Sequence, residues 1–284
     1  MSAIVPQQKV HAVGYCVGGT LLAIAAAAMA RDRDECLGTV TLFAAQTDFT
    51  EAGELMLFIN DSQLTFLEEV MWEQGYLDTK QMAGAFRLLR SNNLIWSRML
   101  KHYLIGERDT LIDLMAWNAD ATRLPHRMHA EYLRQLFLNN DLTEGRYRVG
   151  DRPIALTDIR VPIFAVGMTS DHVAPWRSTY KIHRLTDTDV TYALTTGGHN
   201  AGIVSEAGHP GRSYQIATKR ATEKYEDPDT WLTSASKYEG SWWPAWEQWL
   251  SGHSSGRVSP PAIGAADHGY PPLGSAPGIY VLQE

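Results

Sequence analysis

Apolar strand-like runs and a helical segment alternate within the first 46 residues. Residues 9–15 form a short, partly β-branched run followed by glycines, which predicts a buried strand. Residues 17–31 are rich in Ala and Leu and predict a helix, and residues 38–45 predict a second strand. A strand, a tight turn, a helix and a strand form a βαβ unit, so we expect parallel strands in an α/β sheet.

The pattern changes between residues 47 and 159, where strand-like runs vanish. Leu, Met, Trp and charged residues recur there at helical spacing, as in residues 86–90 and 128–138. We therefore divide the chain into a core made of residues 1–46 and 160–284 and a helical cap insertion over residues 47–159. The aromatic residues of this insertion are expected to pack in its core.

Strand-like patterns return in the last third of the chain. Residues 161–168 and 190–195 predict strands, and residues 174–185 predict a helix with Pro175 in its first turn. Residues 242–250 predict a short amphipathic helix. The tail from residue 251 is rich in Gly, Ser and Pro and predicts a loop.

Composition narrows the class of protein. The 284 residues carry 25 Lys and Arg against 32 Asp and Glu, a net charge of −7, which argues against a general nucleic-acid binder. The two cysteines, Cys16 and Cys36, cannot form a disulfide framework, and we expect Cys36 to be structural. The longest apolar stretch, residues 20–30, is too short for a bilayer, so we expect a cytoplasmic protein without a transmembrane segment.

Candidate chemistry begins at the junction between the first strand and the helix. The sequence GYCVGG places Cys16 between glycines, as in the Gly-x-nucleophile-x-Gly elbow, with Cys in place of the usual Ser. The helix N-terminus behind Cys16 favours a thiolate, and the N–H of Val17 would face a developing oxyanion. A buried structural cysteine in a Gly-rich turn is the alternative.

A nucleophilic cysteine needs a base, and the base needs an acid that orients it. Asp171 and His199 each follow the C-terminal end of a predicted strand, in the chain order expected for this fold class. Asp187 and Asp189 precede a strand and should lie at the opposite end of the sheet. His172 adjoins the acid, and contact with substrate and simple packing both remain open for it.

Two further histidines have the spacing of metal ligands. His126 and His129 are three residues apart on a predicted helix, but no Cys or carboxylate cluster lies near them. We therefore interpret them as part of a solvated helix face and expect no metal site.

Several separated segments together resemble the catalytic domain of polyhydroxyalkanoate synthases, particularly those of class I. The segments cover nearly the whole chain in family order: GYCVGGTL (14–21), MAWNADATRLP (115–125), SDHVAPW (170–176), GGHNAG (197–202), EGSWWPAWEQWL (239–250) and APGIYV (276–281). The resemblance implies an α/β-hydrolase core with a mobile cap and the polymerisation of (R)-3-hydroxyacyl-CoA into polyester.

The resemblance also assigns roles to residues. Cys16 would hold the growing chain as a thioester, His199 would be the general base, and Asp171 would be the third member of the triad. Trp117 falls in the matching cap segment near the site. No metal or organic cofactor is implied, whereas a homodimer at the surface of a polyester granule is.

Two other functions fit part of the pattern. A hydrolase of the dienelactone type shares the Cys, Asp and His residues but offers no reason for the GSWWP segment. A non-catalytic, granule-associated protein derived from a synthase would keep the fold without the reaction.

The position of Cys16 predicts that the front of the domain is missing. In this fold several strands precede the nucleophile, whereas only about eight residues precede the elbow strand here. We therefore expect an N-terminally truncated synthase with an open edge on its elbow strand. The second oxyanion donor would be missing from the chain, and activity of the chain alone would be low.

Overall fold

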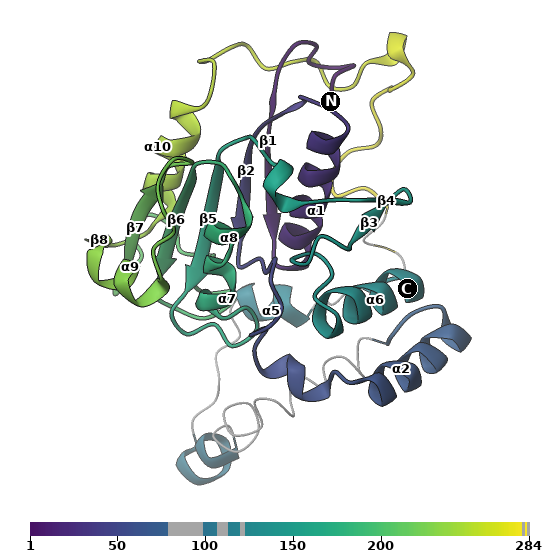
Figure 1. Ribbon diagram of the computed structural model, residues 1–284, viewed down its shortest axis with the longest axis vertical. Helices are drawn as coiled ribbons and strands as arrows, with labels where there is room; N and C mark the ends of the chain where they lie inside the picture. The colour runs from purple at the N-terminus through teal and green to yellow at the C-terminus, as the bar shows by residue number, and fades with distance from the viewer. Residues whose placement is uncertain (79–98, 107–112, 120–122, 280–281, 283–284) are drawn as a thin grey trace.

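A six-stranded mixed sheet forms the centre of the molecule in the order β1-β2-β5-β6-β7-β8 (Figure 1). The computed structural model describes residues 1–78, 99–106, 113–119, 123–279 and 282. The four strands predicted from the sequence pair in parallel, which confirms the α/β class. They are β1 (Val10–Tyr15), β2 (Leu37–Phe43), β5 (Ile163–Met168) and β6 (Val190–Thr195).

Two antiparallel strands extend the sheet beyond β6, and the sequence did not predict them. β7 (Ser213–Lys219) pairs with β6, and β8 (Ser236–Glu239) pairs with β7. β8 is exposed throughout and β7 is mostly half-buried, so neither carries the continuous apolar run that marks a central strand. At the other end, β1 is an edge strand of the described sheet.

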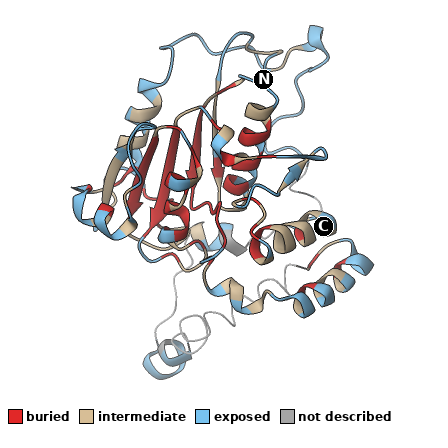
Figure 2. Cartoon of the chain, in the orientation of Figure 1, coloured by how far each residue is buried: buried red, intermediate tan, exposed pale blue. Residues whose placement is uncertain are grey.

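The sheet is buried on both faces because successive residues of each strand point to opposite sides. In β5, Ile163 and Ala165 join the larger apolar cluster, while Phe164 and Val166 join the smaller one. Helix α1 (Val17–Arg31), which ends where the sequence predicts, packs against β1 and β2 on the side of the larger cluster. Figure 2 shows these buried segments in red through the middle of the sheet and the inner side of α1.

The helix predicted over residues 174–185 is split in two. α7 (Trp176–Tyr180) follows Pro175, and α8 (Ile182–Leu185) continues after Lys181. Together with α9 (Pro228–Ser234) they contribute buried side chains to the larger cluster, among them Tyr180 and Trp231.

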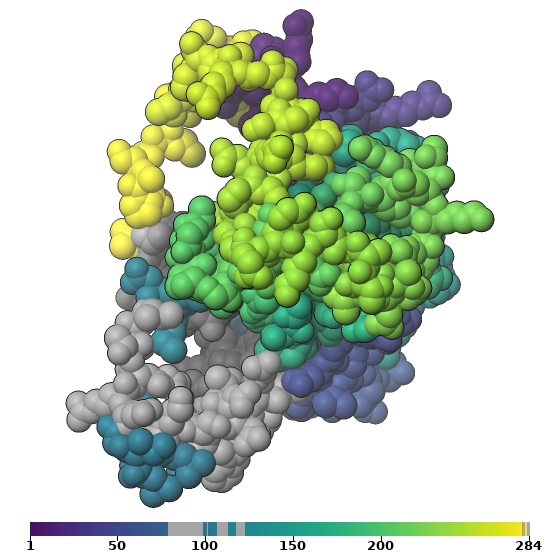
Figure 3. Space-filling view, turned by 90° about the vertical axis from the view of Figure 1, so that its left-hand side faces the viewer, coloured from purple at the N-terminus to yellow at the C-terminus, as the bar shows by residue number. Residues whose placement is uncertain are grey.

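The smaller apolar cluster lies under α10 (Trp243–Gly252), the helix that follows the GSWWP segment. The green-to-yellow C-terminal segments cover the upper and middle part of the side shown in Figure 3. Beyond α10, residues 253–279 are a loop apart from the single turn η6 (Ala266–His268), as the composition of the tail predicts. Within the described part of the chain, no helix combines the length and apolar character needed to cross a bilayer.

The segment between β2 and β5 is mostly helical where the structure describes it, although residues 86–90 lie outside the described residues. It also contains a short hairpin that the sequence did not predict, β3 (Arg148–Val149) with β4 (Arg152–Pro153). Leu136 and Ile154 are fully buried in the larger core cluster, so the end of this segment packs with the sheet. The boundaries of the cap stay a prediction. The helical elements are η1 (Glu54–Phe58), α2 (Asp61–Gln74), η3 (Leu100–Ile105), α5 (Asp113–Ala119), α6 (His126–Glu131), η4 (Tyr132–Leu138) and η5 (Leu156–Asp158).

Glycine is required where α1 crosses β1 and the loop after β2. A Cβ atom on Gly19 would lie 2.4 Å from the Cβ of Ala45 and 2.9 Å from the carbonyl oxygen of Gly14. A Cβ on Gly18 would meet nothing within 4 Å. We expect Gly19→Ala to lower the free energy of unfolding by about 1–3 kcal/mol through overpacking. The matched Gly18→Ala should leave it unchanged or raise it by up to about 1 kcal/mol. Urea unfolding of both variants measures the difference, and equal effects would contradict the close approach.

Candidate active site

Cys16 lies on a strained turn between β1 and α1. Its backbone φ of 52° and ψ of −122° are rarely adopted by residues other than glycine. The turn is fixed because the N–H of Cys16 donates to the carbonyl of Phe43 at 2.8 Å, and the Cys16 carbonyl accepts from Gly19 and Thr20. The thiol is thus held at the N-terminus of α1, at the C-terminal end of the central strands.

Asp171 follows β5 and is fixed by its own loop. Its Oδ1 accepts the backbone N–H groups of Val173 and Ala174 at 2.8 and 2.9 Å. The side chain is fully buried, and its other oxygen, Oδ2, lies 2.7 Å from Nδ1 of His199. One carboxylate oxygen is therefore hydrogen-bonded to the backbone, and the other is hydrogen-bonded to the imidazole.

His199 follows β6 and joins the acid to the cysteine. Its ring hydrogen-bonds both to Asp171 and to the side chain of Cys16. Because Nδ1 faces Asp171, Nε2 is the nitrogen available to the sulfur. The structure thus brings together the three residues that the sequence selected, while their catalytic roles stay a prediction.

The environment of His199 favours its charged form. Burial opposes an imidazolium, but the hydrogen bonds to Asp171 and Cys16, together with their negative charges, outweigh it. The pKa of His199 rises from its ordinary value of 6.5 to about 9. Protonation of His199 therefore stabilises the fold fully below about pH 6.5, and this contribution is lost as the pH rises through about 9.

The pKa of His199 should depend on the sulfur of Cys16. Cys16→Ala removes a hydrogen bond and a negative charge that raise it, so we expect the pKa to fall from about 9 toward 6.5. NMR titration of the imidazole resonances measures the change, with the exposed His268 as internal control. An unchanged pKa in this variant would contradict the contact between His199 and Cys16.

Two tyrosines also face the site, and the sequence analysis missed both. The hydroxyl of Tyr15 donates to the His199 carbonyl at 3.2 Å and to Oδ1 of Asn200; burial and the charges of Cys16 and Asp171 raise its pKa. Tyr132, on η4, hydrogen-bonds to Thr20, and burial and the charge of Cys16 raise its pKa. Tyr15 lies inside the elbow motif and could have been found there, whereas only the fold brings Tyr132 close.

The remaining predicted site residues are less closely tied to the triad. Val17 begins α1, where the first N–H groups of a helix have no intrahelical acceptor, so an oxyanion role stays a prediction. His172 is half-buried beside Asp171, and its carbonyl oxygen approaches Gly53. Trp117 on α5 is 55% exposed, and no described contact joins it to Cys16, Asp171 or His199.

The interpretation of the histidine pair as a solvated face is wrong for one member. His129 is only 4% exposed because α6 packs against α2, and burial lowers its pKa. Among the described residues, no group of three or more His, Cys, Asp or Glu side chains is arranged to hold a metal ion. Cys36 is a half-buried free thiol in the loop immediately before β2.

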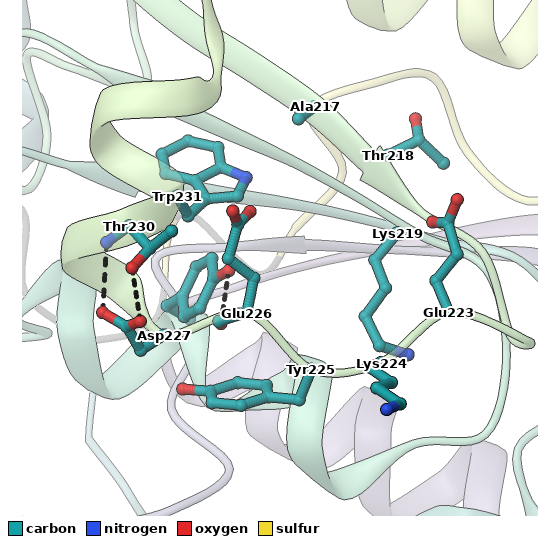
Figure 4. A pocket seen from close by; sticks show the side chains of 11 residues that line it. Ala217, Thr218, Lys219, Glu223, Lys224, Tyr225, Glu226, Asp227, Thr230 and Trp231 are labelled. Carbon is teal, nitrogen blue, oxygen red and sulfur yellow. Dashed lines mark hydrogen bonds between the residues drawn. The ribbon is translucent and has the colours of Figure 1, made fainter.

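A cavity of about 500 Å³ lies between β7 and α9, lined among others by Lys219, Tyr225 and Trp231 (Figure 4). Lys219 pairs with Val190, the first residue of β6, whereas His199 follows the last. The cavity therefore lies at the end of the strands opposite the triad, and it is separate from the triad. Asp189 lies at this same end and pairs with Arg220, as its position before β6 predicts.

Comparison with known proteins places the fold. A family model described as the α/β hydrolase fold matches residues 3–206. The chain belongs to the α/β-hydrolase family. In this family the nucleophile, the acid and the histidine come in the chain order found for Cys16, Asp171 and His199.

Nearly the whole chain aligns with curated relatives. It is 40% identical over 278 residues to a poly(3-hydroxyalkanoate) polymerase subunit of Rhizobium etli, covering 98% of this chain and 43% of the relative. It is 40% identical to a poly(3-hydroxyalkanoate) polymerase of Methylorubrum extorquens, covering 97% and 45%, and 32% identical to a polymerase subunit of Cupriavidus necator, covering 97% and 47%. The chain thus spans less than half the length of these relatives.

Solved structures are more distant. A monoacylglycerol lipase from Paleococcus ferrophilus covers 87% of this chain and 70% of its own, at 14% identity and a TM-score of 0.39.

Proposed function

We propose that this chain carries the catalytic centre of a poly(3-hydroxyalkanoate) polymerase. It would transfer (R)-3-hydroxyacyl groups from CoA thioesters to a growing polyester through a thioester on Cys16. The observation that carries the proposal is a cysteine elbow hydrogen-bonded to a His–Asp pair, in a chain 40% identical to named polymerases over 98% of its length.

The first step is an exchange of thioesters. An imidazolium at His199 stabilises a thiolate on Cys16, and the thiolate attacks the carbonyl carbon of the acyl-CoA. The N–H of Val17 is placed to donate to the oxyanion. When the C–S bond to CoA breaks, the CoA thiolate takes the proton from His199, which leaves an acylated Cys16 and a neutral imidazole.

The second step uses that neutral imidazole as a base. Acylation removes the negative charge on Cys16, one of the causes that raise the pKa of His199, so the proton is released more readily. His199 then accepts the proton of an attacking 3-hydroxyl group, and a new ester bond forms as the bond to sulfur breaks. Asp171 keeps Nδ1 protonated throughout and stabilises the imidazolium.

A cysteine suits this reaction better than a serine. A thioester keeps the acyl group activated for the next hydroxyl, whereas a serine ester would be a poorer acyl donor. Water must be excluded so that the intermediate is not hydrolysed. The helical segment between β2 and β5 is the part of the chain that we expect to do this, because Tyr132 on η4 is buried close enough to Cys16 for the charge of Cys16 to raise its pKa.

The proposal extends to the whole protein. The resemblance to polyhydroxyalkanoate synthases supports a homodimer without a metal or organic cofactor, and a water-insoluble product supports a place at the surface of a cytoplasmic polyester granule. The substrate side-chain length is expected to be short, as for class I synthases.

Product analysis tests the proposal. The purified chain is incubated with (R)-3-hydroxybutyryl-CoA, free CoA is titrated with a thiol reagent, and products are analysed by mass spectrometry. We expect slow CoA release together with linear ester oligomers. CoA release with monomeric acid alone would instead indicate a hydrolase, and intact substrate would indicate a non-catalytic protein.

A further inference from the structure

The Ser241–Trp243 segment makes three hydrogen bonds to the loop that carries His199. The indole N–H of Trp242 donates to the Gly202 carbonyl at 2.9 Å, and that of Trp243 donates to the Ile203 carbonyl at 2.8 Å. The hydroxyl of Ser241 donates to the Ser205 carbonyl. Three consecutive side chains thus bind three backbone carbonyls about 40 residues away. The sequence did not predict these contacts.

The loop itself transmits this restraint to the imidazole. The N–H of Gly202 donates to the Gly198 carbonyl at 2.8 Å, and the N–H groups of Ile203 and Val204 donate to the Asn200 carbonyl. Residues 198–204 therefore form a compact turn that contains His199, so hydrogen bonds to the C-terminal end of this turn restrain the backbone that carries the imidazole. On the other side, Tyr15 holds the carbonyl of His199 itself.

Trp242 also contacts the residue that holds the nucleophile. It is fully buried, and its ring lies edge-on against Phe43 with centroids 5.0 Å apart. Phe43 supplies the carbonyl that accepts the N–H of Cys16. The side chain of Trp242 therefore contacts both Phe43, which holds the backbone of Cys16, and the loop that carries His199.

We propose that Trp242 and Trp243 are positioning residues, which set the distance and orientation of His199 relative to Cys16. The inference rests on the proposed function for its catalytic consequence, although the hydrogen bonds themselves do not. Indole donors suit this role because a large, stiff ring can pack while its N–H fixes a backbone carbonyl. The ring of Trp242 is buried in the smaller apolar cluster, and the ring of Trp243 packs edge-on against Trp242. Loss of one donor should let the loop relax and weaken the contact between His199 and Cys16.

Helix α10 supplies a matched control. Trp246 also packs on Phe43 with centroids 5.0 Å apart, but its indole N–H donates to the hydroxyl of Thr41 on β2 and not to the His199 loop. Replacement of either tryptophan by phenylalanine keeps an aromatic ring and removes the N–H. Trp243→Phe therefore removes the donor to the Ile203 carbonyl in the His199 loop, whereas Trp246→Phe removes the donor to the Thr41 hydroxyl on β2. Trp243, at 37% exposed, tolerates the change more readily than the fully buried Trp242.

The test compares Trp242→Phe, Trp243→Phe and Trp246→Phe in the full chain. Alkylation of Cys16 by iodoacetamide at pH 7 is followed by peptide mass spectrometry, which separates it from Cys36, and the pKa of His199 is measured by NMR. For Trp243→Phe we expect alkylation to slow about fivefold to tenfold and the pKa to fall from about 9 toward 6.5. Trp242→Phe should do at least as much, and Trp246→Phe should stay within about twofold of the parent chain.

Neither measurement requires acyl transfer, so its result is independent of the proposed function. Melting temperatures separate positioning from folding. If Trp243→Phe melts close to the parent chain and leaves both the alkylation rate and the His199 pKa unchanged, the proposal is overturned. It is also overturned if Trp246→Phe changes both quantities as much as Trp243→Phe does.

Discussion

Cys16→Ala should abolish polymer formation and reduce CoA release by a factor on the order of 10⁴ or more. The reason is that the proposed mechanism carries the acyl group on the sulfur of Cys16. Asp171 accepts hydrogen bonds from the backbone N–H groups of Val173 and Ala174 and from His199, and His199 acts as the base. Neither is therefore expected to replace the sulfur as the nucleophile. The rate of CoA release from (R)-3-hydroxybutyryl-CoA, measured before and after substitution, gives the factor.

The second cysteine provides the control for this experiment. Cys36 is in the loop immediately before β2, outside the triad, so Cys36→Ala should retain the parent rate within about twofold. Cys16→Ser keeps the shape of the elbow and should still lose most of the activity, since an oxygen ester is the poorer acyl donor. Retention of CoA release by Cys16→Ala would contradict covalent catalysis.

Asp171→Asn should lower kcat by a factor on the order of 10³ to 10⁴ and leave KM nearly unchanged. Oδ1 of Asp171 accepts two backbone N–H groups, so the amide oxygen of asparagine would take that position. Its NH₂ group would then point at Nδ1 of His199 and force that nitrogen to accept. The proton would move to Nε2, which faces Cys16 and could no longer act as a base.

The rival carboxylates supply the matched control here. Asp187 is exposed and lies before β6, at the edge of the sheet away from His199, so Asp187→Asn should leave kcat within about twofold of the parent chain. Steady-state measurements of CoA release separate kcat from KM in both variants. Equal losses in Asp171→Asn and Asp187→Asn would reject the assignment of the acid.

The sequence predicted the parts of this molecule in which local pattern and tertiary structure agree. The buried strands carry continuous apolar runs, and Gly14 and Gly19 leave no room for a Cβ atom where α1 crosses β1. The candidate triad was predictable because Cys16, Asp171 and His199 each follow a strand end, and parallel strands bring their C-terminal ends to one edge.

What the sequence did not predict depends on contacts between distant segments. β7 and β8 are mostly half-buried or exposed, and they become strands only because β7 pairs with β6 and β8 pairs with β7. His129 is buried by α2, which no pattern around His129 indicates. The contacts of Tyr132 and of the two indole donors are equally non-local. Each of these side chains interacts with a carbonyl, hydroxyl or sulfur more than 35 residues away along the chain.

The most direct test of the central claim is to detect the acyl group on Cys16. The chain is mixed with (R)-3-hydroxybutyryl-CoA, quenched in acid, and mapped by peptide mass spectrometry. We expect the peptide containing Cys16 to gain one or more 3-hydroxybutyryl units, which neutral hydroxylamine removes as it does other thioesters, while Cys36 stays unmodified. Turnover of the substrate without any adduct on Cys16, or with the adduct on another residue, would contradict the account.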